Sequence, residues 1–198
     1  MFLIDIHSSG RLPYTIGKSI NDYSAQVLYK STTSILQIPY SEGLLVDYRH
    51  FDAKNIAPRF EFGFGLSYTT FAYSGLTISG STVGGTAPTG SALDPWLHTK
   101  VLTVTFTIKN SGAVGGHEIP QLYTTPPASA NSPPKNLKGF DSVYIDPGQS
   151  KTVTIQLSRY DLSIWDVVAQ RWRVPTGSHG ISIGASSRDI RLTGTVTV

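Results

Sequence analysis

The sequence predicts an all-β fold in which the second half of the chain forms a β-sandwich. Strand-like alternation of apolar and polar residues recurs after residue 70, with almost no helical periodicity. Turn signals such as Asn110-Ser111-Gly112 and Asp146-Pro147-Gly148 separate the apolar runs. A hydrophobic content of 39% is sufficient for a packed core. About eight short strands at this spacing are typical of a sandwich.

The clearest strand covers residues 101–109, where Leu102, Val104, Phe106 and Ile108 lie on one face of the pleat. The other predicted strands have the same alternation or a high content of β-branched residues, and they are residues 72–78, 118–124, 138–145, 151–157, 171–174, 180–184 and 190–198. Between the first two strands, residues 79–95 are rich in Gly, Ser, Thr and Pro, which predicts a loop.

The first third of the chain has a different character. Residues 2–6 form a short apolar run that indicates a buried strand, and Pro13 biases Leu12 towards an extended conformation. Residues 42–71 combine aromatic rings, glycines and charges at high density, with little that would form an independent core. We therefore predict two units: a partly irregular segment, residues 1–70, and a β-sandwich domain, residues 71–198.

Composition excludes several classes of function. A net charge of +3 comes from scattered Lys and Arg residues, so no basic stripe for nucleic acid is present. The absence of cysteine excludes disulfides and thiolate chemistry. No stretch approaches the roughly twenty apolar residues of a membrane span. The first residues lack the basic and apolar regions of a secretion signal.

The carboxylates do not form a convincing catalytic pair. A retaining glycosidase needs two carboxyl groups about 5–5.5 Å apart, one ionised and one with a raised pKa. Glu61 lies between two phenylalanines, but strand alternation places it opposite both rings. The acidic residues weighed for this role are Glu42, Asp47, Asp52, Glu61, Glu118 and Asp166. We predict no catalytic residue and expect Arg49, Asp52 and Arg59 to form ion pairs instead.

No cofactor or metal site is predicted. The five histidines are far apart and lack a ligand spacing such as His-x3-His. The stretch Gly63-Phe64-Gly65-Leu66-Ser67 lacks the Lys-Ser/Thr ending of a phosphate-binding loop, and its glycines are better explained by tight turns beneath large rings.

Aromatic side chains offer one function that needs no acid–base pair. Pyranose rings and phenolic polymers stack on exposed tryptophan and tyrosine. Trp96, Tyr160 and Trp165 are the candidate stacking residues, and Trp172 is a fourth ring weighed for this role. Trp172 lies in the predicted strand 171–174, so we expect it in the sandwich core.

Several tracts resemble, in the same order, the C-terminal part of fungal glycoside hydrolase family 3 β-glucosidases. The matching tracts are SGRLPYT at 9–15, EGLLVDYRHFD at 42–52, PRFEFGFGLSYTTF at 58–71, GGHEIPQLY at 115–123, KNLKGF at 135–140, YDLSIWD at 160–166 and GASSRDI at 184–190. The resemblance implies an immunoglobulin-like, fibronectin type III-like sandwich preceded by the end of an α/β-sandwich domain. The family's nucleophile lies in a Ser-Asp-Trp motif that this chain lacks, so no catalytic residue carries over.

The resemblance implies a non-catalytic portion that braces the catalytic domains of an enzyme hydrolysing terminal β-D-glucosyl residues. Its partners would be those domains, in cis, and the family implies an extracellular, secreted protein. Exposed apolar surface would also favour self-association. The residues expected to pack between domains carry rings or guanidinium groups, and they are Tyr48, Arg49, Phe51, Arg59, Phe60, Phe62, Phe64 and Tyr68.

A second hypothesis belongs to another class of protein. The chain would be a free-standing module that binds cellulose, other glycans or lignin through Trp96, Tyr160 and Trp165. The two hypotheses are distinguished by whether those three rings form an accessible platform. Neither hypothesis involves nucleic acid or a membrane.

Overall fold

The computed structural model of the chain describes residues 8–27, 37–85 and 91–198. The expected strand at residues 2–6 and part of the expected loop at 79–95 lie outside the described residues. Short helical turns lie at Ile20–Asp22 (η1), Tyr48–Ala53 (α1), Pro95–His98 (α2), Ala128–Ala130 (η2) and Arg159–Leu162 (α3). No helix among the described residues is long and apolar enough to cross a membrane.

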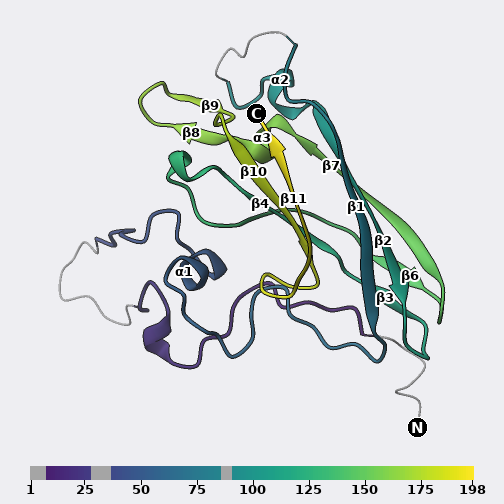
Figure 1. Cartoon of the computed structure of the whole chain (residues 1–198). Helices are drawn as coiled ribbons and strands as arrows, with labels where there is room; N and C mark the ends of the chain where they lie inside the picture. The colour runs from purple at the N-terminus through teal and green to yellow at the C-terminus, as the bar shows by residue number, and fades with distance from the viewer. Residues whose placement is uncertain (1–7, 28–36, 86–90) are drawn as a thin grey trace.

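Two sheets face each other, as the β-sandwich prediction requires. The first has the order β1-β2-β7, from strands Phe71–Gly80, Lys100–Asn110 and Ser150–Ser158. The second has the order β11-β10-β4-β5, from strands Ile190–Thr197, Ser178–Gly184, Gln121–Thr125 and Asn136–Phe140. All their pairings are antiparallel. In Figure 1 strands β10 and β11 of the second sheet lie beside β1, β2 and β7 of the first, with α1 on the side away from the first sheet.

Two of the predicted strands are broken in two. The run 118–124 is divided at Pro120, which cannot donate to a ladder, into β3 (Gly116–Glu118) and β4. The run 138–145 becomes β5 and β6 (Val143–Ile145), and β6 pairs with β3 in a small separate sheet. The fold class is therefore confirmed, with a more interrupted chain path than the alternation alone indicates.

The core lies between the two sheets. Leu102, Val104, Phe106 and Ile108 are each at most 1% exposed, which confirms the face predicted for this strand. They belong to one apolar cluster with residues of the opposite sheet, including Leu122, Ile181 and Ile183. Burying this many large apolar side chains is the main source of stability for the sandwich.

The expectation that Trp172 lies in this core is wrong. Its strand, β9 (Arg171–Arg173), pairs only with β8 (Ile164–Asp166) in a two-stranded hairpin outside the main sheets. Arg171 and Arg173 are exposed and Trp172 is half-buried. A strand of three residues that has arginine at both ends presents a single apolar side chain, which is too little to enter a sheet interior.

The segment before β1 has little regular structure. Residues 12–16 and 60–64 run side by side: the Leu12 N–H donates to the Phe64 carbonyl at 2.8 Å, and the Ile16 N–H donates to the Phe60 carbonyl at 2.8 Å. This confirms a partly irregular segment. That residues 1–70 and 71–198 are separate units stays a prediction.

Candidate functional site: the contact between the N-terminal segment and the sandwich

Helix α1 is fixed at its first residue by the carboxylate of Asp47. This side chain accepts the N–H of Tyr48, and it also accepts both the N–H and the hydroxyl of Thr15, each at 2.8 Å. Asp47 adopts a positive φ of 51°, a backbone conformation that such local hydrogen bonds help to hold. Three donors occupy this carboxylate, so it serves as a helix cap and a tie rather than half of a catalytic pair.

The helix turns two rings into the protein. Tyr48 is 7% exposed, with its ring 4.7 Å from that of Phe62 and 6.0 Å from that of Tyr123 in β4. The Tyr48 hydroxyl accepts the N–H of Leu137 in β5 at 2.9 Å. Phe51 is 1% exposed and packs edge-on against Tyr23 at 5.5 Å. Helix α1 is thereby bound to the edge of the second sheet by both ring packing and a hydrogen bond.

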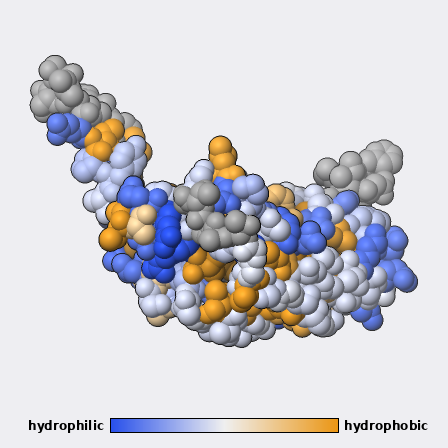
Figure 2. All heavy atoms as spheres, turned by 90° about the horizontal axis from the view of Figure 1, so that it is seen from above, coloured by the Kyte–Doolittle hydropathy of each residue, from blue (hydrophilic) through white to orange (hydrophobic). Residues whose placement is uncertain are grey.

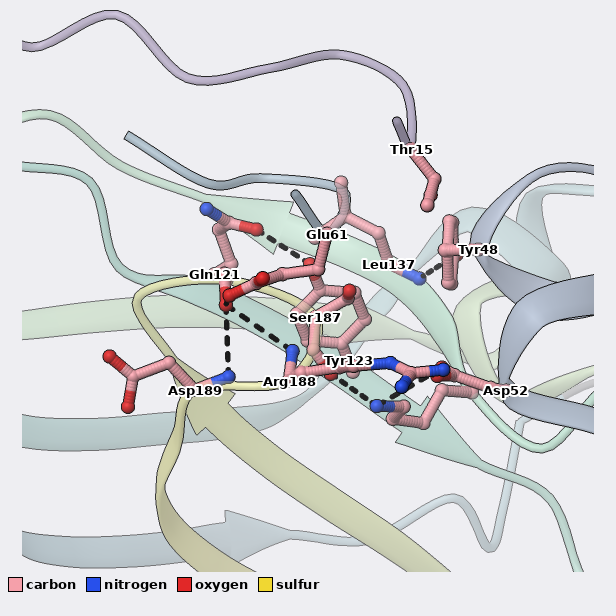
Figure 3. A network of polar contacts seen from close by, with 12 residues as sticks. Thr15, Tyr48, Asp52, Glu61, Gln121, Tyr123, Leu137, Ser187, Arg188 and Asp189 are labelled. Carbon is pink, nitrogen blue, oxygen red and sulfur yellow. Dashed lines mark hydrogen bonds and ion pairs between the residues drawn. The ribbon is translucent and has the colours of Figure 1, made fainter. Parts of the chain in front are cut away.

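A carboxylate on the same helix faces two cations of the sandwich. Oδ1 of Asp52 lies 3.1 Å from Nε of Arg188, and Oδ2 lies 3.1 Å from Nζ of Lys135, the latter as an ion pair without hydrogen-bond geometry. Arg188 also donates to the Ile56 carbonyl at 2.8 Å, and Lys135 donates to the Ser187 carbonyl. Figure 3 shows Asp52 and Arg188 pointing toward each other across this contact.

The ion pairs expected for Arg49 and Arg59 are not formed. Asp52 pairs with Lys135 and Arg188, whereas within the described residues neither Arg49 nor Arg59 has a carboxylate at ion-pair distance. Arg49 lies 5.7 Å from the Tyr48 ring instead, and Arg59 is exposed. Charges close in sequence are not partners here because the fold brings more distant cations to Asp52.

An amide at the start of β4 holds the next stretch of the segment. Nε2 of Gln121 donates to the carbonyls of Gly63, at 3.0 Å, and Ala185, at 2.8 Å, while its Oε1 accepts the hydroxyl of Tyr123 at 2.6 Å. Gln121 is 3% exposed, so all three hydrogen bonds are shielded from water. Burial raises the pKa of Tyr123, which keeps its hydroxyl protonated as a donor.

Glu61 has a structural partner. Its Oε1 accepts the Ser186 hydroxyl at 2.7 Å, and Ser186 in turn accepts the N–H groups of Arg188 and Asp189. The glutamate therefore faces the turn between β10 and β11, while its neighbour Phe62 packs on Tyr48. Residues 62 and 63 form a turn, and the two rings have different neighbours, Phe60 packing on Phe64 and Phe62 on Tyr48, so the strand alternation expected for Phe60-Glu61-Phe62 does not describe this stretch.

A second buried ion pair ties the chain further from α1. Nη2 of Arg11 lies 2.9 Å from Oε2 of Glu118, whose Oε1 accepts the hydroxyl of Tyr73 at 2.7 Å. Side-chain exposures of 11% and 4% for Arg11 and Glu118 place this pair out of bulk water. Burial, followed by the neighbouring Glu118 charge, raises the pKa of Tyr73. Glu118 is thus a second anchor for the N-terminal segment.

The residues expected to pack between domains divide into two groups. Tyr48, Phe51, Phe62 and Phe64 are buried or half-buried by contacts within this chain. Phe60 and Tyr68 remain 39% and 65% exposed. The structure therefore packs the first group within this chain, Tyr48 on Tyr123 of the sandwich and Phe51 and Phe64 on rings of the segment itself, and it leaves the second group on the surface. Packing against another domain stays a prediction for these residues.

Large apolar side chains are also exposed elsewhere on the N-terminal segment. They stand 39–79% exposed and are Tyr14, Ile20, Tyr23, Val27, Ile38, Tyr40, Leu44 and Val46. In Figure 2 this part of the chain projects from the body, with orange side chains among blue ones. Exposed apolar groups at this density on one segment are typical of a contact surface.

The candidate stacking residues are brought together only in part. Tyr160 and Trp165 each lie edge-on to Trp172, at 4.7 Å and 5.6 Å between ring centroids. Trp96 lines one pocket with Trp172, but no ring contact joins it to the cluster among the described residues. The Arg159 guanidinium lies 4.5 Å from its ring, and its Nε1 donates to the Gly84 carbonyl at 2.9 Å. Sequence reasoning weighed Trp172 as a stacking residue but preferred the core for it, because of its place in the predicted strand, and so did not identify this ring as the centre of the cluster.

Asp166 closes the turn of the β8–β9 hairpin. Its carboxylate accepts the N–H groups of Ala169 and Val168 and pairs with Arg173 at 2.7 Å. These hydrogen bonds, that from Ala169 first, lower the pKa of Asp166. Among the described residues, no group of three or more His, Cys, Asp or Glu side chains is arranged to hold a metal ion.

Comparison with known proteins connects these contacts to a class of protein. Residues 118–187 match the family model of the fibronectin type III-like domain. The chain is 46% identical over 98% of its length to a probable β-glucosidase D of Emericella nidulans, and 49% identical over 98% to a probable β-glucosidase L of the same organism. The matched regions make up 24% and 26% of those relatives, so the chain spans about a quarter of their length.

Solved structures give the same result. A β-D-glucoside glucohydrolase from Trichoderma reesei matches with a TM-score of 0.86 at 50% identity, over 98% of this chain and 27% of that one. A glycoside hydrolase family 3 β-glucosidase from Neurospora crassa matches with a TM-score of 0.85 at 28% identity, over 97% of this chain and 32% of that one. The protein is a β-sandwich of the fibronectin type III-like class. Over almost its whole length it is similar to the C-terminal part of fungal family 3 β-glucosidases.

Proposed function

We propose that this chain is a non-catalytic structural portion of a family 3 β-glucosidase, which stabilises the catalytic domains of an enzyme acting on terminal β-D-glucosyl residues. The observation that carries the proposal is that the N-terminal segment is held to the sandwich by polar contacts and also exposes apolar side chains to solvent. Polar contacts of Asp52, Gln121 and Glu118 fix it to the sandwich, while several of its apolar side chains, such as Ile20, Tyr40 and Leu44, remain exposed. An anchored segment with unburied apolar groups is suited to hold a further domain.

The named relatives support the choice of partner. They are β-glucosidases about four times the length that this chain matches, so the exposed segment would face the remainder of such an enzyme. The contact would be made in cis, and secretion would follow from the whole enzyme. Free of that remainder, the same surface would favour self-association.

The catalytic half of the proposal is tested with the pure chain. No carboxyl pair with the environments needed for glycoside hydrolysis is seen among the described residues, since Asp47, Glu61 and Asp166 are each engaged in structural hydrogen bonds. We expect the pure chain to hydrolyse an aryl β-glucoside no faster than a matched preparation of host protein that lacks the chain. Turnover that co-purifies with the chain would contradict the proposal.

The proposed stabilisation of catalytic domains is tested with this chain inside a whole enzyme. In a chimera, this chain replaces the matching quarter of the Emericella nidulans β-glucosidase D relative. Charged replacements in the exposed segment, Ile20→Lys and Tyr40→Lys, should shorten the half-life of the chimera's activity on heating. Val168→Lys, at a residue that is 97% exposed on the β8–β9 turn, is the matched control and should have no effect.

The two chimera variants also distinguish bracing from general damage. Ile20 and Tyr40 are 63% and 79% exposed, so their replacement should leave the unfolding of the isolated chain unchanged. A chimera that retains its full half-life with both replacements would show that this surface supports no other domain.

A flat platform for polysaccharide is the less favoured reading. The guanidinium of Arg159 lies over the ring of Trp96. The rings of Tyr160 and Trp165 are steeply inclined to that of Trp172, at interplanar angles of 67° and 70°. A platform requires coplanar, open faces. The stacking roles of Trp96, Tyr160 and Trp165 stay predictions, to be tested by pull-down on insoluble cellulose and lignin.

A further inference from the structure

A cavity of about 460 Å³ lies where the N-terminal segment, the second sheet and the β8–β9 hairpin meet. Arg49 lines it from α1, Lys138 from β5, and Trp165 and Trp172 from the hairpin. This volume falls in the range of small-molecule sites. Its lining does not include the carboxylates Asp52 and Glu118 that anchor the segment, and of the eight exposed apolar residues named above it includes Leu44 alone.

Two cations line this cavity without a carboxylate at ion-pair distance. Within the described residues, Nε of Arg49 is buried and has no hydrogen-bond partner. The ammonium of Lys138 lies 5.4 Å from the centre of the Tyr160 ring and has no acceptor there. Lys135 and Arg188, by contrast, share Asp52. The two lining cations therefore differ from the cations that hold the fold.

The nearest carboxylate is already engaged. Asp161, which also lines the cavity, accepts the N–H and the hydroxyl of Ser158 at 2.7 and 2.8 Å, and it pairs with Lys100 at 3.4 Å. Burial lowers the pKa of Lys138, and the nearby Arg49 charge lowers it further, while Asp161 opposes both. An anion in the cavity would relieve this repulsion.

The hairpin contributes ring surface beside the two cations. Trp165 is 41% exposed, and its ring is 5.6 Å from that of Trp172. Aromatic side chains of this kind bind the faces of pyranose and arene rings, while a guanidinium and an ammonium bind a carboxylate through charge-assisted hydrogen bonds. A neutral ring would leave both cations unsatisfied.

We propose that this cavity binds a small organic anion whose carboxylate is attached to a six-membered ring. Arg49 and Lys138 hold the carboxylate, and Trp165 contacts the ring. The carboxylated ring is either a uronic pyranose or an aromatic acid, which share the recognised chemistry. The inference is independent of the bracing function, because it concerns a different face of α1 and needs no other domain.

The test uses the full chain and two matched pairs of ligands in calorimetric titration. Methyl β-D-glucuronide is compared with methyl β-D-glucoside, and benzoate with benzamide. We expect at least one carboxylate to bind with a dissociation constant of about a millimolar or lower, and its neutral counterpart to bind about tenfold more weakly or worse. The pair that binds identifies whether the ring is a sugar or an arene.

Variants then place the ligand in this cavity. Arg49→Gln and Lys138→Met should each weaken binding of the carboxylate about tenfold, and Trp165→Ala should weaken it as well. Lys151→Met, on an exposed residue of β7, removes one positive charge outside the cavity and should leave the affinity unchanged. Circular dichroism checks that each variant is folded. If Arg49→Gln does not fold, the comparison of each carboxylate with its neutral counterpart on the parent chain still tests the inference.

Three results would overturn the inference. They are equal binding of acid and neutral ligands, an equal loss of affinity in Lys151→Met, and no binding of either carboxylate. A tetraglutamate peptide is included as a further ligand: binding of that peptide alone would show that the cavity receives an acidic protein segment and not a small anion.

Discussion

Oδ1 of Asp52 in helix α1 lies 3.1 Å from Nε of Arg188, a residue 136 positions later in the chain. Lys135 approaches the other oxygen of the same carboxylate. The Asp52 side chain is only 10% exposed, so these charges interact in a medium less polar than water. One carboxylate thereby joins the N-terminal segment to two separate parts of the sandwich.

Replacing this carboxylate by its amide should loosen the segment. Asp52→Asn leaves Lys135 and Arg188 partly buried without a counter-charge, so we expect the free energy of unfolding to fall by about 1–3 kcal/mol. Denaturant unfolding of the chain measures this. Asp189→Asn is the control, because the Asp189–Arg191 pair is 41–42% exposed and should contribute less than about 1 kcal/mol. Equal losses in the two variants would contradict a special role for Asp52.

The Tyr48 hydroxyl offers a narrower test of the same contact. Tyr48→Phe keeps the packed ring but leaves the N–H of Leu137 without its acceptor, which should cost about 1–2 kcal/mol of unfolding free energy. Tyr40→Phe is the matched control, since Tyr40 is 79% exposed and should change stability by less than about 0.5 kcal/mol. A Tyr48→Phe variant as stable as the parent would mean that water replaces the hydroxyl freely.

The strands of the sandwich could be predicted from sequence because each carries its own signal. Residues 101–109 alternate strictly, and burial follows that alternation residue by residue. Helix α1 has six residues, fewer than two full turns, so no apolar period can appear in it. Its cap, Asp47, was visible only as one of several acidic residues.

The anchoring contacts were beyond sequence reasoning for a different reason. Gln121 meets Gly63 and Ala185, residues separated from it by 58 and 64 positions, and no local pattern encodes such a meeting. The error over Trp172 has the same origin, because a strand of three residues takes its partner from the tertiary fold. Resemblance to a family indicated that residues 42–71 form an interface, but which cations meet Asp52 follows only from the structure.

Two buried tyrosines predict loss of stability at alkaline pH. Burial raises the pKa of Tyr73 and that of Tyr123 above the ordinary value of 10.0. In the unfolded chain both phenols lose their protons near pH 10, whereas the folded chain keeps them. Their contribution is therefore complete below about pH 10 and is lost as pH rises further, by up to about 1.4 kcal/mol per pH unit for each tyrosine.

Lys138 acts in the opposite direction, because burial lowers its pKa below 10.5. The folded state loses this proton first, so its contribution increases with pH up to the unfolded pKa and then stays constant. Above about pH 10.5 only the tyrosine effect remains. Denaturant unfolding between about pH 8 and pH 11.5 should show no loss of stability from these groups below about pH 10 and falling stability above about pH 10.5, with a shallower fall in Tyr73→Phe. An unchanged slope in that variant would remove Tyr73 from the explanation.

Gly63 is a position where the backbone of the segment tolerates little change. Its φ is +80°, a region that L residues rarely adopt, and an added Cβ would collide with the buried side-chain amide of Gln121. Gly63→Ala should therefore lower the free energy of unfolding by about 3 kcal/mol, through backbone strain together with displacement of Gln121 from the Ala185 carbonyl. Gly43 provides a matched control, because its φ is +55° and nothing lies within 4 Å of an added Cβ. Gly43→Ala retains only the backbone cost, about 1 kcal/mol, so the difference between the two variants in denaturant unfolding measures the close approach to Gln121. If the two variants lose the same free energy of unfolding, the whole effect comes from backbone conformation and the contact with Gln121 contributes nothing measurable.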